Sequence, residues 1–208
     1  MAPVHHNVLE MVGNTPMLEL RNLDAGPCRL FAKLELMNPS GSIKDRIGVS
    51  MIEAAERAVK IDPNTDPKRT LVEPTAENTG LALALVASQK GYKLIVVVPD
   101  KMAAGKIQHL RAMGAEVVMA RSDVTRGHPE YYQEVAARIA RNTDNSFFIN
   151  QFFNDANVAA HEEHTGPEIL AQIEADTGSP PDALIVGVGS GGTLTGCARA
   201  LRARRPDV

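Results

Sequence analysis

The feature that most constrains the fold is a run of five apolar residues at 94–98, Leu-Ile-Val-Val-Val, with helical patterns on either side. Such a run is typical of a strand buried on both faces, as in a parallel sheet. Further strands are predicted at 17–20, 29–36, 70–73, 116–120, 146–150 and 183–186, and helices at 42–59, 79–90, 103–113, 130–141 and 193–204. Helical periodicity also runs from 159 to 175, where Pro167 is expected to start a second helix. The alternation predicts an α/β fold with doubly wound, mostly parallel sheets.

Composition excludes several classes of protein. Of the 208 residues, 44% are hydrophobic and 23% charged, and the formal net charge is −3, so no basic field indicates a nucleic-acid partner. No apolar run approaches the roughly 20 residues of a membrane span, and no signal pattern opens the chain, so we predict a cytoplasmic protein without a membrane partner. Cys28 and Cys197 lack the spacing of a zinc site or a disulfide framework, and we expect both to be buried.

A turn at 38–46, Asn-Pro-Ser-Gly-Ser-Ile-Lys-Asp-Arg, places Lys44 in the first turn of a predicted helix. The N-terminus of a helix is the positive end of its dipole and disfavours an ammonium group. We therefore expect the pKa of Lys44 to lie below the reference value of about 10.4. A partly neutral lysine attacks carbonyl groups and forms Schiff bases. The alternative is a surface lysine beside a helix cap formed by Ser42.

A second turn, at 73–80, joins a predicted strand to a predicted helix, where parallel sheets bind ligands. Its sequence, Glu-Pro-Thr-Ala-Glu-Asn-Thr-Gly, offers hydroxyls, an amide and the N–H groups of a helix start, which suit a carboxylate or a phosphate. The alternative is a helix cap formed by Asn78 or Thr75.

The third turn, 187–193, reads Gly-Val-Gly-Ser-Gly-Gly-Thr and lets the backbone approach an anion, with hydroxyl donors from Ser190 and Thr193. A phosphate cradle is favoured over a turn that serves only helix–strand packing. The turn also matches the dinucleotide fingerprint G-x-G-x-x-G, but Asp207, near the distance where that fingerprint has an acidic residue, follows no strand. A Schiff-base lysine and a phosphate cradle together predict pyridoxal phosphate as the cofactor.

With these turns in place, the chain resembles the cysteine synthase / cystathionine β-synthase family, the fold-type II pyridoxal-phosphate enzymes. Residues 38–46 resemble the family's cofactor-lysine motif, 75–80 its asparagine loop, and 189–193 its phosphate loop. Residues 13–16 match its opening motif, and Asn150-Gln151-Phe152, Ala160-His161 and 165–169 together resemble a further signature. The resemblance covers nearly the whole chain.

The resemblance implies roles for individual residues. Lys44 would carry pyridoxal 5′-phosphate as a Schiff base and then act as general base on the substrate's α-proton. Asn78 would bond the ring hydroxyl oxygen of the cofactor. The cofactor's phosphate would be held by Gly189, Ser190, Gly191, Gly192 and Thr193. The substrate carboxylate would be held by Thr75, Ala76, Asn78, Thr79 and Gln151. No metal site is predicted, and His161 and His164 are interpreted as local structure.

The implied reaction is β-replacement, in which serine or an O-activated serine loses its β-substituent and a thiol or sulfide adds. Residues 100–102 and 123–132, together with Ala76 where many cysteine synthases carry Ser, favour cystathionine β-synthase. Cysteine synthase (O-acetylserine sulfhydrylase) is the alternative. The implied partners are a small-molecule amino-acid substrate, a thiol or sulfide, and a second copy of the chain in a homodimer.

The family's two-domain architecture would divide this chain into a larger cofactor-binding domain at 1–40 and 150–208 and a smaller mobile domain at 41–149. The family's catalytic core runs beyond the length of this chain, so we expect the second domain to be incomplete. The partner of the cofactor's pyridine nitrogen would lie in the missing part.

Glu77 departs from the family, which usually has Gly at this position. An inward-facing carboxylate about 4 Å from a substrate carboxylate would cost roughly 4 kcal/mol at an effective dielectric near 20. A non-catalytic, truncated relative that acts as a binding partner is therefore a further alternative.

Overall fold

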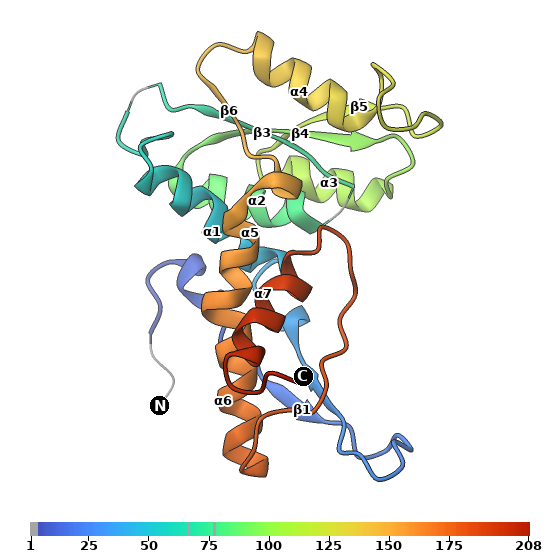
Figure 1. Cartoon of the computed structure of the whole chain (residues 1–208). Coiled ribbons are helices and arrows are strands. Elements are labelled where there is room, and N and C mark those ends of the chain that lie inside the picture. The colour runs from blue at the N-terminus through green and yellow to red at the C-terminus, as the bar shows by residue number, and fades with distance from the viewer. Residues whose placement is uncertain (1–3, 66, 77) are drawn as a thin grey trace.

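A four-stranded parallel sheet forms the centre of the upper half of the molecule (Figure 1). The computed structural model describes residues 4–65, 67–76 and 78–208. The strands lie in the order β5-β4-β3-β6, and each pairing is parallel. Their bounds are β3 Thr70–Pro74, β4 Lys93–Pro99, β5 Glu116–Ala120 and β6 Ser146–Phe148. The predicted α/β fold with a mostly parallel sheet is confirmed.

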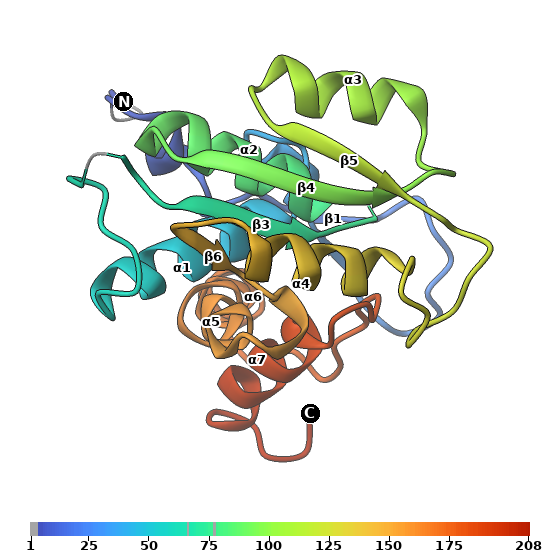
Figure 2. The same ribbon diagram turned by 90° about the horizontal axis from the view of Figure 1, so that it is seen from above.

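Helices cover both faces of this sheet (Figures 1 and 2). On one face lie α1 (Lys44–Arg57), α2 (Asn78–Lys90) and α3 (Ala104–Ala112), and on the other lies α4 (Tyr132–Asn142). Leu71 of β3 packs with the first group of helices, whereas the next residue, Val72, packs with Ala136 of α4. Successive side chains of a strand point to opposite faces, so a continuously apolar strand needs a helix layer on each side.

The order of the strands reverses next to β3. The chain runs outward from β3 through β4 to β5, and α4 then carries it back to place β6 on the other side of β3. The carboxyl ends of β3 and β6 therefore flank the point of reversal, which is where open α/β sheets bind ligands.

The lower half consists of helices and a small antiparallel strand pair, β1 with β2 (Figure 1). Its elements are β1 Met17–Glu19, β2 Phe31–Lys33, α5 Asp155–Ala160, the π-helical turn η4 His161–Thr165, α6 Gly166–Thr177 and α7 Gly192–Arg202. Short 3-10 turns lie at η1 Val8–Met11, η2 Glu35–Met37 and η3 Gln151–Phe153. Ile169 and Ile173 of α6 pack against Cys197 and Leu201 of α7 to form a second apolar core.

A second helix, α6, begins at Gly166 with Pro167 in its first turn, as predicted, but α5, η4 and α6 follow one another without a break. Proline cannot donate a backbone hydrogen bond, and its ring clashes with the carbonyl four residues earlier in a regular α-helix. The π-turn just before it removes this conflict, and the Gly166 N–H donates to the carbonyl of His161, five residues back. The turn thus accommodates the proline.

The strand predicted at 183–186 is not formed, and Ile185 is 91% exposed. A strand needs a neighbour for its backbone hydrogen bonds, and within the described ranges no strand pairs with this segment. Cys28 was predicted to be buried and is exposed, since it lies in the loop between β1 and β2, whereas Cys197 is buried. None of the helices in the described part of the chain is long and apolar enough to cross a bilayer.

The first turn of α1 is anchored by Arg46, whose side chain is 3% exposed. Its guanidinium donates to both carboxylate oxygens of Glu35 in η2, at 2.7 and 2.8 Å, and to both of Glu168 in α6, at 2.8 and 2.7 Å. Lys33 also donates to Glu168, at 2.7 Å. Two bidentate, charge-assisted pairs therefore tie the start of α1 to the lower half of the molecule.

Replacing Arg46 by Met would leave Glu35 and Glu168 largely buried without their main partner. We expect the free energy of unfolding at neutral pH to fall by about 3–5 kcal/mol, measured by urea denaturation. The control is Arg57→Met, which removes an exposed arginine from the same helix and should change little. An R46M protein as stable as the control would contradict this account.

The same variant should change the response to acid. Burial opposes ionisation of Glu168, but hydrogen bonds from Arg46 and Lys33 outweigh it and lower the pKa of Glu168 from 4.5 to about 2. A carboxyl group whose pKa is lower when folded contributes stability above its unfolded pKa and loses it as the pH falls through the folded pKa. The wild type should therefore lose stability between about pH 4.5 and pH 2 more steeply than R46M.

The contact between α7 and the π-turn depends on Gly196. A Cβ at this position would lie 2.4 Å from the carbonyl oxygen of Val158 and 2.7 Å from the Cβ of His161. Only glycine lets the two helices approach this closely, and their approach places Thr193, one turn earlier, next to His161.

Gly196→Ala should therefore push α7 away from the π-turn and lower the free energy of unfolding by about 1–3 kcal/mol. The matched control is Gly105→Ala in α3, where a Cβ meets nothing within 4 Å and alanine is the better helix former. Chemical denaturation of both variants measures the difference. Equal effects at the two positions would show that the close helix contact is unimportant.

Candidate active site

The carboxyl ends of β3 and β6 bring Thr79 and Gln151 together. The Thr79 hydroxyl donates to Oε1 of Gln151 at 2.8 Å, and Nε2 of Gln151 donates to the Pro74 carbonyl at 3.4 Å. Thr75 and Thr79 are both buried, and the Gly80 N–H donates to the Thr75 hydroxyl at 3.3 Å. Three of the residues predicted to hold a substrate carboxylate thus lie at the point where the strand order reverses.

The other residues of this loop lie closer to solvent. Asn78 is the first residue of α2 and is half-buried, and Ala76 is exposed. Glu77, the predicted departure from the family pattern, lies outside the described residues.

Lys44 is the first residue of α1 and is half-buried. Burial lowers the pKa of its ammonium group, so the expected direction of the shift is correct. Its backbone N–H donates to the Ser42 hydroxyl at 3.2 Å, although the N-cap residue of α1 is Ile43 rather than the predicted Ser42. The neighbouring Asp45 carboxylate accepts hydrogen bonds from the backbone N–H and the hydroxyl of Ser40. Within the described ranges, Lys44 forms no ion pair.

The glycine loop leads into α7, whose first residue is Gly192. The Ser190 hydroxyl accepts a hydrogen bond from Nδ2 of Asn157 at 2.9 Å. Gly192 lies so close to this amide that a Cβ would be 2.0 Å from Oδ1 of Asn157, so the position requires glycine. The loop is thereby pressed onto the start of α5.

His161, in the first position of the π-turn, lies under the other end of this loop and is fully buried. Its Nε2 is 3.1 Å from the Thr193 hydroxyl and its Nδ1 is 2.9 Å from the Thr165 hydroxyl. Burial, and then the positive charge of Lys44, lower the pKa of His161 to about 4, so its imidazole is neutral at pH 7.

Asn157 joins the two parts of the site. Its Nδ2 donates both to the carbonyl of Gln151 and to the Ser190 hydroxyl, each at 2.9 Å. Sequence reasoning assigned no role to Asn157 and interpreted His161 as local structure. Their i, i+4 spacing would have placed them on one helix face, but nothing in the sequence says that this face meets residues 190–193.

Glu73, at the end of β3, is a further buried residue with no predicted role. Its Oε1 accepts the Gln151 N–H at 3.3 Å, and its Oε2 has no hydrogen-bond partner among the described residues. Burial raises the pKa of Glu73 to about 8, so it is protonated at neutral pH. Burial also raises the pKa of Tyr132 in α4.

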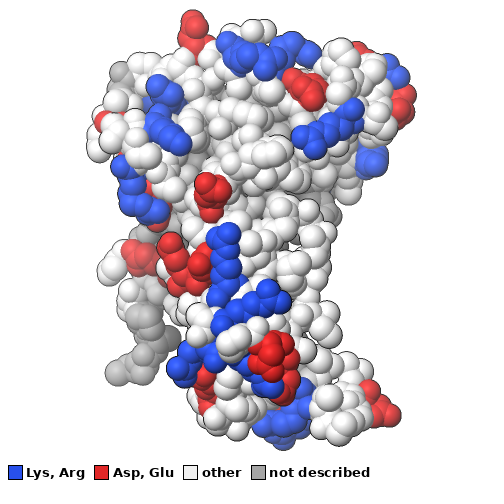
Figure 3. Space-filling model, viewed as in Figure 1, with Lys and Arg blue, Asp and Glu red and all other residues white. Residues whose placement is uncertain are grey.

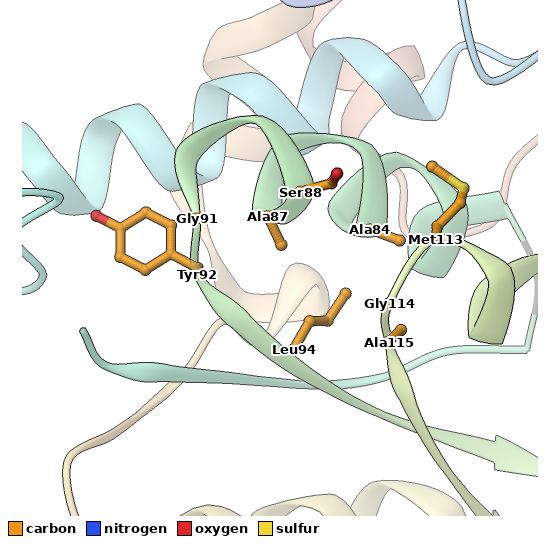
Figure 4. A pocket seen from close by; sticks show the side chains of 9 residues that line it. All are labelled: Ala84, Ala87, Ser88, Gly91, Tyr92, Leu94, Met113, Gly114 and Ala115. Carbon is orange, nitrogen blue, oxygen red and sulfur yellow. The ribbon is translucent and has the colours of Figure 1, made fainter. Parts of the chain in front are cut away.

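Two other features are separate from this site. A surface cavity of about 270 Å³ lies at the amino ends of β4 and β5 (Figure 4). Its lining has no His, Lys, Cys, Asp or Glu side chain and consists of Ala84, Ala87, Ser88, Gly91, Tyr92, Leu94, Met113, Gly114 and Ala115. Charges of both signs are interspersed on the face shown in Figure 3.

Among the described residues, no cluster of His, Cys, Asp or Glu is arranged to hold a metal ion.

Comparison with known proteins places this geometry in a wider group. A family profile described as "Pyridoxal-phosphate dependent enzyme" matches residues 8–208. The chain is 42% identical over 203 residues to cystathionine beta-synthase of Mus musculus, covering 96% of this chain and 35% of that protein. It is also 42% identical over 200 residues to Cysteine synthase 3 of Caenorhabditis elegans, covering 96% of this chain and 56% of that protein.

A solved structure agrees with these similarities. A hydrogen sulfide-producing enzyme from Fusobacterium nucleatum superposes with a TM-score of 0.88 and 35% identity over 100% of this chain and 65% of its own. This chain therefore spans about a third of the mouse protein and about two thirds of the bacterial one. The fold is that of the fold-type II pyridoxal-phosphate enzymes, and its second domain is incomplete, as predicted.

The protonated state of Glu73 has a measurable consequence. A carboxyl group with a raised folded pKa binds its proton more tightly when folded, so stability is lost as the pH rises from about 4.5 to about 8 and then levels off. Glu73→Gln keeps the shape of the neutral acid and should remove this slope. Urea denaturation between pH 5 and 9 should show that Glu73→Gln raises the free energy of unfolding above that of the wild type, most of all at high pH. The exposed Glu116→Gln should show no such increase.

Proposed function

Because this chain belongs to the pyridoxal-phosphate-dependent enzyme family, we propose that its site serves β-replacement on serine or an O-activated serine. The observation that carries the proposal is that Asn157, near the start of α5, binds both Gln151 of the Thr79–Gln151 pair and Ser190 of the glycine loop. The helix that begins at Lys44 packs beside α5, where Ser50 donates to the Ala156 carbonyl. The named relatives include both cystathionine beta-synthase and cysteine synthase, which supports the reaction class without separating the two activities.

The residues present fit pyridoxal 5′-phosphate. Lys44 is half-buried, forms no ion pair with the described carboxylates, and has a lowered pKa, as a covalent anchor for an aldehyde requires. Gly189, Ser190, Gly191, Gly192 and Thr193 would hold the phosphate against backbone N–H groups and two hydroxyls, and Asn78 would contact the ring oxygen. When bound, the cofactor supplies an electron sink that stabilises negative charge at the substrate's α-carbon.

The substrate side is organised by Gln151. Since Thr79 donates to its Oε1, the amide is fixed with Nε2 as the donor. The bond from Nε2 to Pro74 is long, at 3.4 Å, so this group can donate to a substrate carboxylate. Thr75, Ala76, Asn78 and Thr79 would complete the pocket at the start of α2. Lys44 Nζ would accept the α-proton, and the lowered pKa favours the neutral amine that this step needs.

Between the two activities we favour cystathionine β-synthase, on residues 100–102, 123–132 and Ala76; cysteine synthase is the alternative. Serine with homocysteine tests the first activity, and O-acetylserine with sulfide tests the second. A larger kcat/KM for the second pair would reverse the preference.

A non-catalytic binding partner is the other candidate, and Glu77, at a position where the family usually has Gly, favours it. Glu77→Gly should raise amino-acid affinity if this carboxylate opposes the substrate. A homodimer, a cytoplasmic location, and a division into domains at 1–40 with 150–208 and at 41–149 stay predictions from the sequence. In that division the bonds from Arg46 to Glu35 and Glu168 lie at the domain boundary.

The decisive test of the proposal is labelling of Lys44. The purified chain mixed with pyridoxal phosphate should become yellow, and borohydride reduction followed by peptide mapping should find the label on Lys44. Lys44→Ala should abolish both the colour and any β-replacement, whereas Lys101→Ala, at an exposed turn, should alter neither. Labelling that spreads over surface lysines, or activity that survives Lys44→Ala, would refute the assignment.

A further inference from the structure

We propose that Asn157 and His161 are positioning residues that make the Ser190 and Thr193 hydroxyls accept hydrogen bonds from the protein, leaving both hydroxyl protons for an anion in the glycine loop. The inference rests on the proposed function, because the anion in question is the phosphate of the cofactor. It concerns two buried side chains, four residues apart on one helix, that face the loop from below.

The direction of the Asn157 bond follows from its second partner. Its Nδ2 lies 2.9 Å from the Gln151 carbonyl, and a carbonyl only accepts, so the amide must present its NH₂ group there. The same NH₂ group faces the Ser190 hydroxyl at 2.9 Å, so the hydroxyl oxygen is the acceptor. Rotating the amide would place Oδ1 against a carbonyl oxygen. The proton of Ser190 is therefore directed elsewhere.

The direction of the His161 bonds follows from Thr165. The hydroxyl of Thr165 is buried, with 2% of the residue exposed, and Nδ1 of His161 is its one hydrogen-bond partner among the described residues. A buried hydroxyl proton left without an acceptor costs about 1–3 kcal/mol, so Thr165 donates to Nδ1. The imidazole is neutral, so its single proton is on Nε2 and is donated to Thr193 at 3.1 Å.

The hydroxyl oxygens of Ser190 and Thr193 thus each accept a hydrogen bond from the helix beneath the loop. Ser190 and Thr193 are half-buried, so their protons can reach a ligand in the loop. Hydrogen bonds to a charged acceptor are about twice as strong as those between neutral groups. A phosphate group gains from two donors already pointing at it, whereas a ligand lacking the phosphate gains nothing. This difference separates a positioning role from simple packing of α7 on α5.

The first experiment compares pyridoxal phosphate with pyridoxal, which has the same aldehyde and no phosphate. Visible absorbance titration of the 208-residue chain gives both affinities. Asn157→Ala and His161→Ala should each weaken pyridoxal phosphate binding by at least about tenfold, the effect of one lost charge-assisted hydrogen bond. The affinity for pyridoxal should stay unchanged.

Thr165→Val provides a variant that does not touch the loop and keeps the side-chain shape. It removes the proton that fixes the His161 tautomer, so it should also weaken pyridoxal phosphate selectively. The control is Thr177→Val in α6, whose hydroxyl donates to the backbone carbonyl of Ile173, remote from the loop. This control should leave both affinities unchanged.

The second experiment needs no cofactor. Imidazole ¹⁵N NMR of the chain alone should show His161 neutral with its proton on Nε2, and Thr165→Val should shift this tautomer toward Nδ1. A proton on Nδ1 in the wild type would overturn the proposal, because Thr193 would then donate to the histidine. Equal losses for pyridoxal and pyridoxal phosphate in the variants would also overturn it, since they indicate a purely structural role.

Failure of the proposed function gives a different result. If the wild type binds neither aldehyde on Lys44, the assignment of this site to pyridoxal phosphate is wrong. The NMR measurement still decides how His161 and Thr193 share their hydrogen bond. If the wild type binds both aldehydes on Lys44 and the variants bind pyridoxal phosphate as tightly as the wild type does, only the inference about Asn157 and His161 fails.

Discussion

The position of Lys44 depends on Arg46, two residues later in the same helix. A buried guanidinium is strongly disfavoured unless each of its N–H groups finds an acceptor, and here two carboxylates from different elements provide them. Glu35 precedes the Lys44 turn and Glu168 lies in the long helix of the lower half. The start of α1 therefore cannot shift without leaving charges unpaired away from water. Lys44 is therefore held in place by the anchored start of its helix. Its amine forms no ion pair with the described carboxylates.

The long helix that begins at Asp155 plays the complementary part. In its first two turns, Asn157 binds Gln151, which follows β6, and Ser190 of the glycine loop. His161 contacts Thr193 at the end of the same loop. The Thr79–Gln151 pair and the glycine loop are therefore not independent, since the amide group of Asn157 binds both Gln151 and Ser190. A shift of Gln151 would move Asn157 and therefore also change its hydrogen bond to Ser190. Glu73, held neutral beneath the same backbone, supports Gln151 without adding a negative charge near an anion site.

Much of the fold followed from local patterns. The apolar run at 94–98 predicted the parallel sheet, and the turns after β3 and before α7 marked candidate site residues, because period and turn chemistry are local properties. Contacts between distant segments were harder to predict. Asn157 and His161 acquire their roles only by meeting residues more than thirty positions away. The segment 183–186 has the composition of a strand, but pairing depends on a neighbour. The lowered pKa of Lys44 was predicted from the helix dipole alone, and the burial that also lowers it is a tertiary property that local sequence does not show.

The π-turn at His161–Thr165 also sets the phase of the helix that carries it. Each residue turns an α-helix by about 100°, and a π-turn holds one residue more than a regular turn. The residues before it and after it therefore face directions that an uninterrupted α-helix could not combine. Asn157 and His161 look toward the glycine loop, while Glu168 looks toward Arg46. One extra residue in a single turn thus lets one continuous helix contact both the glycine loop and Arg46 at the start of α1.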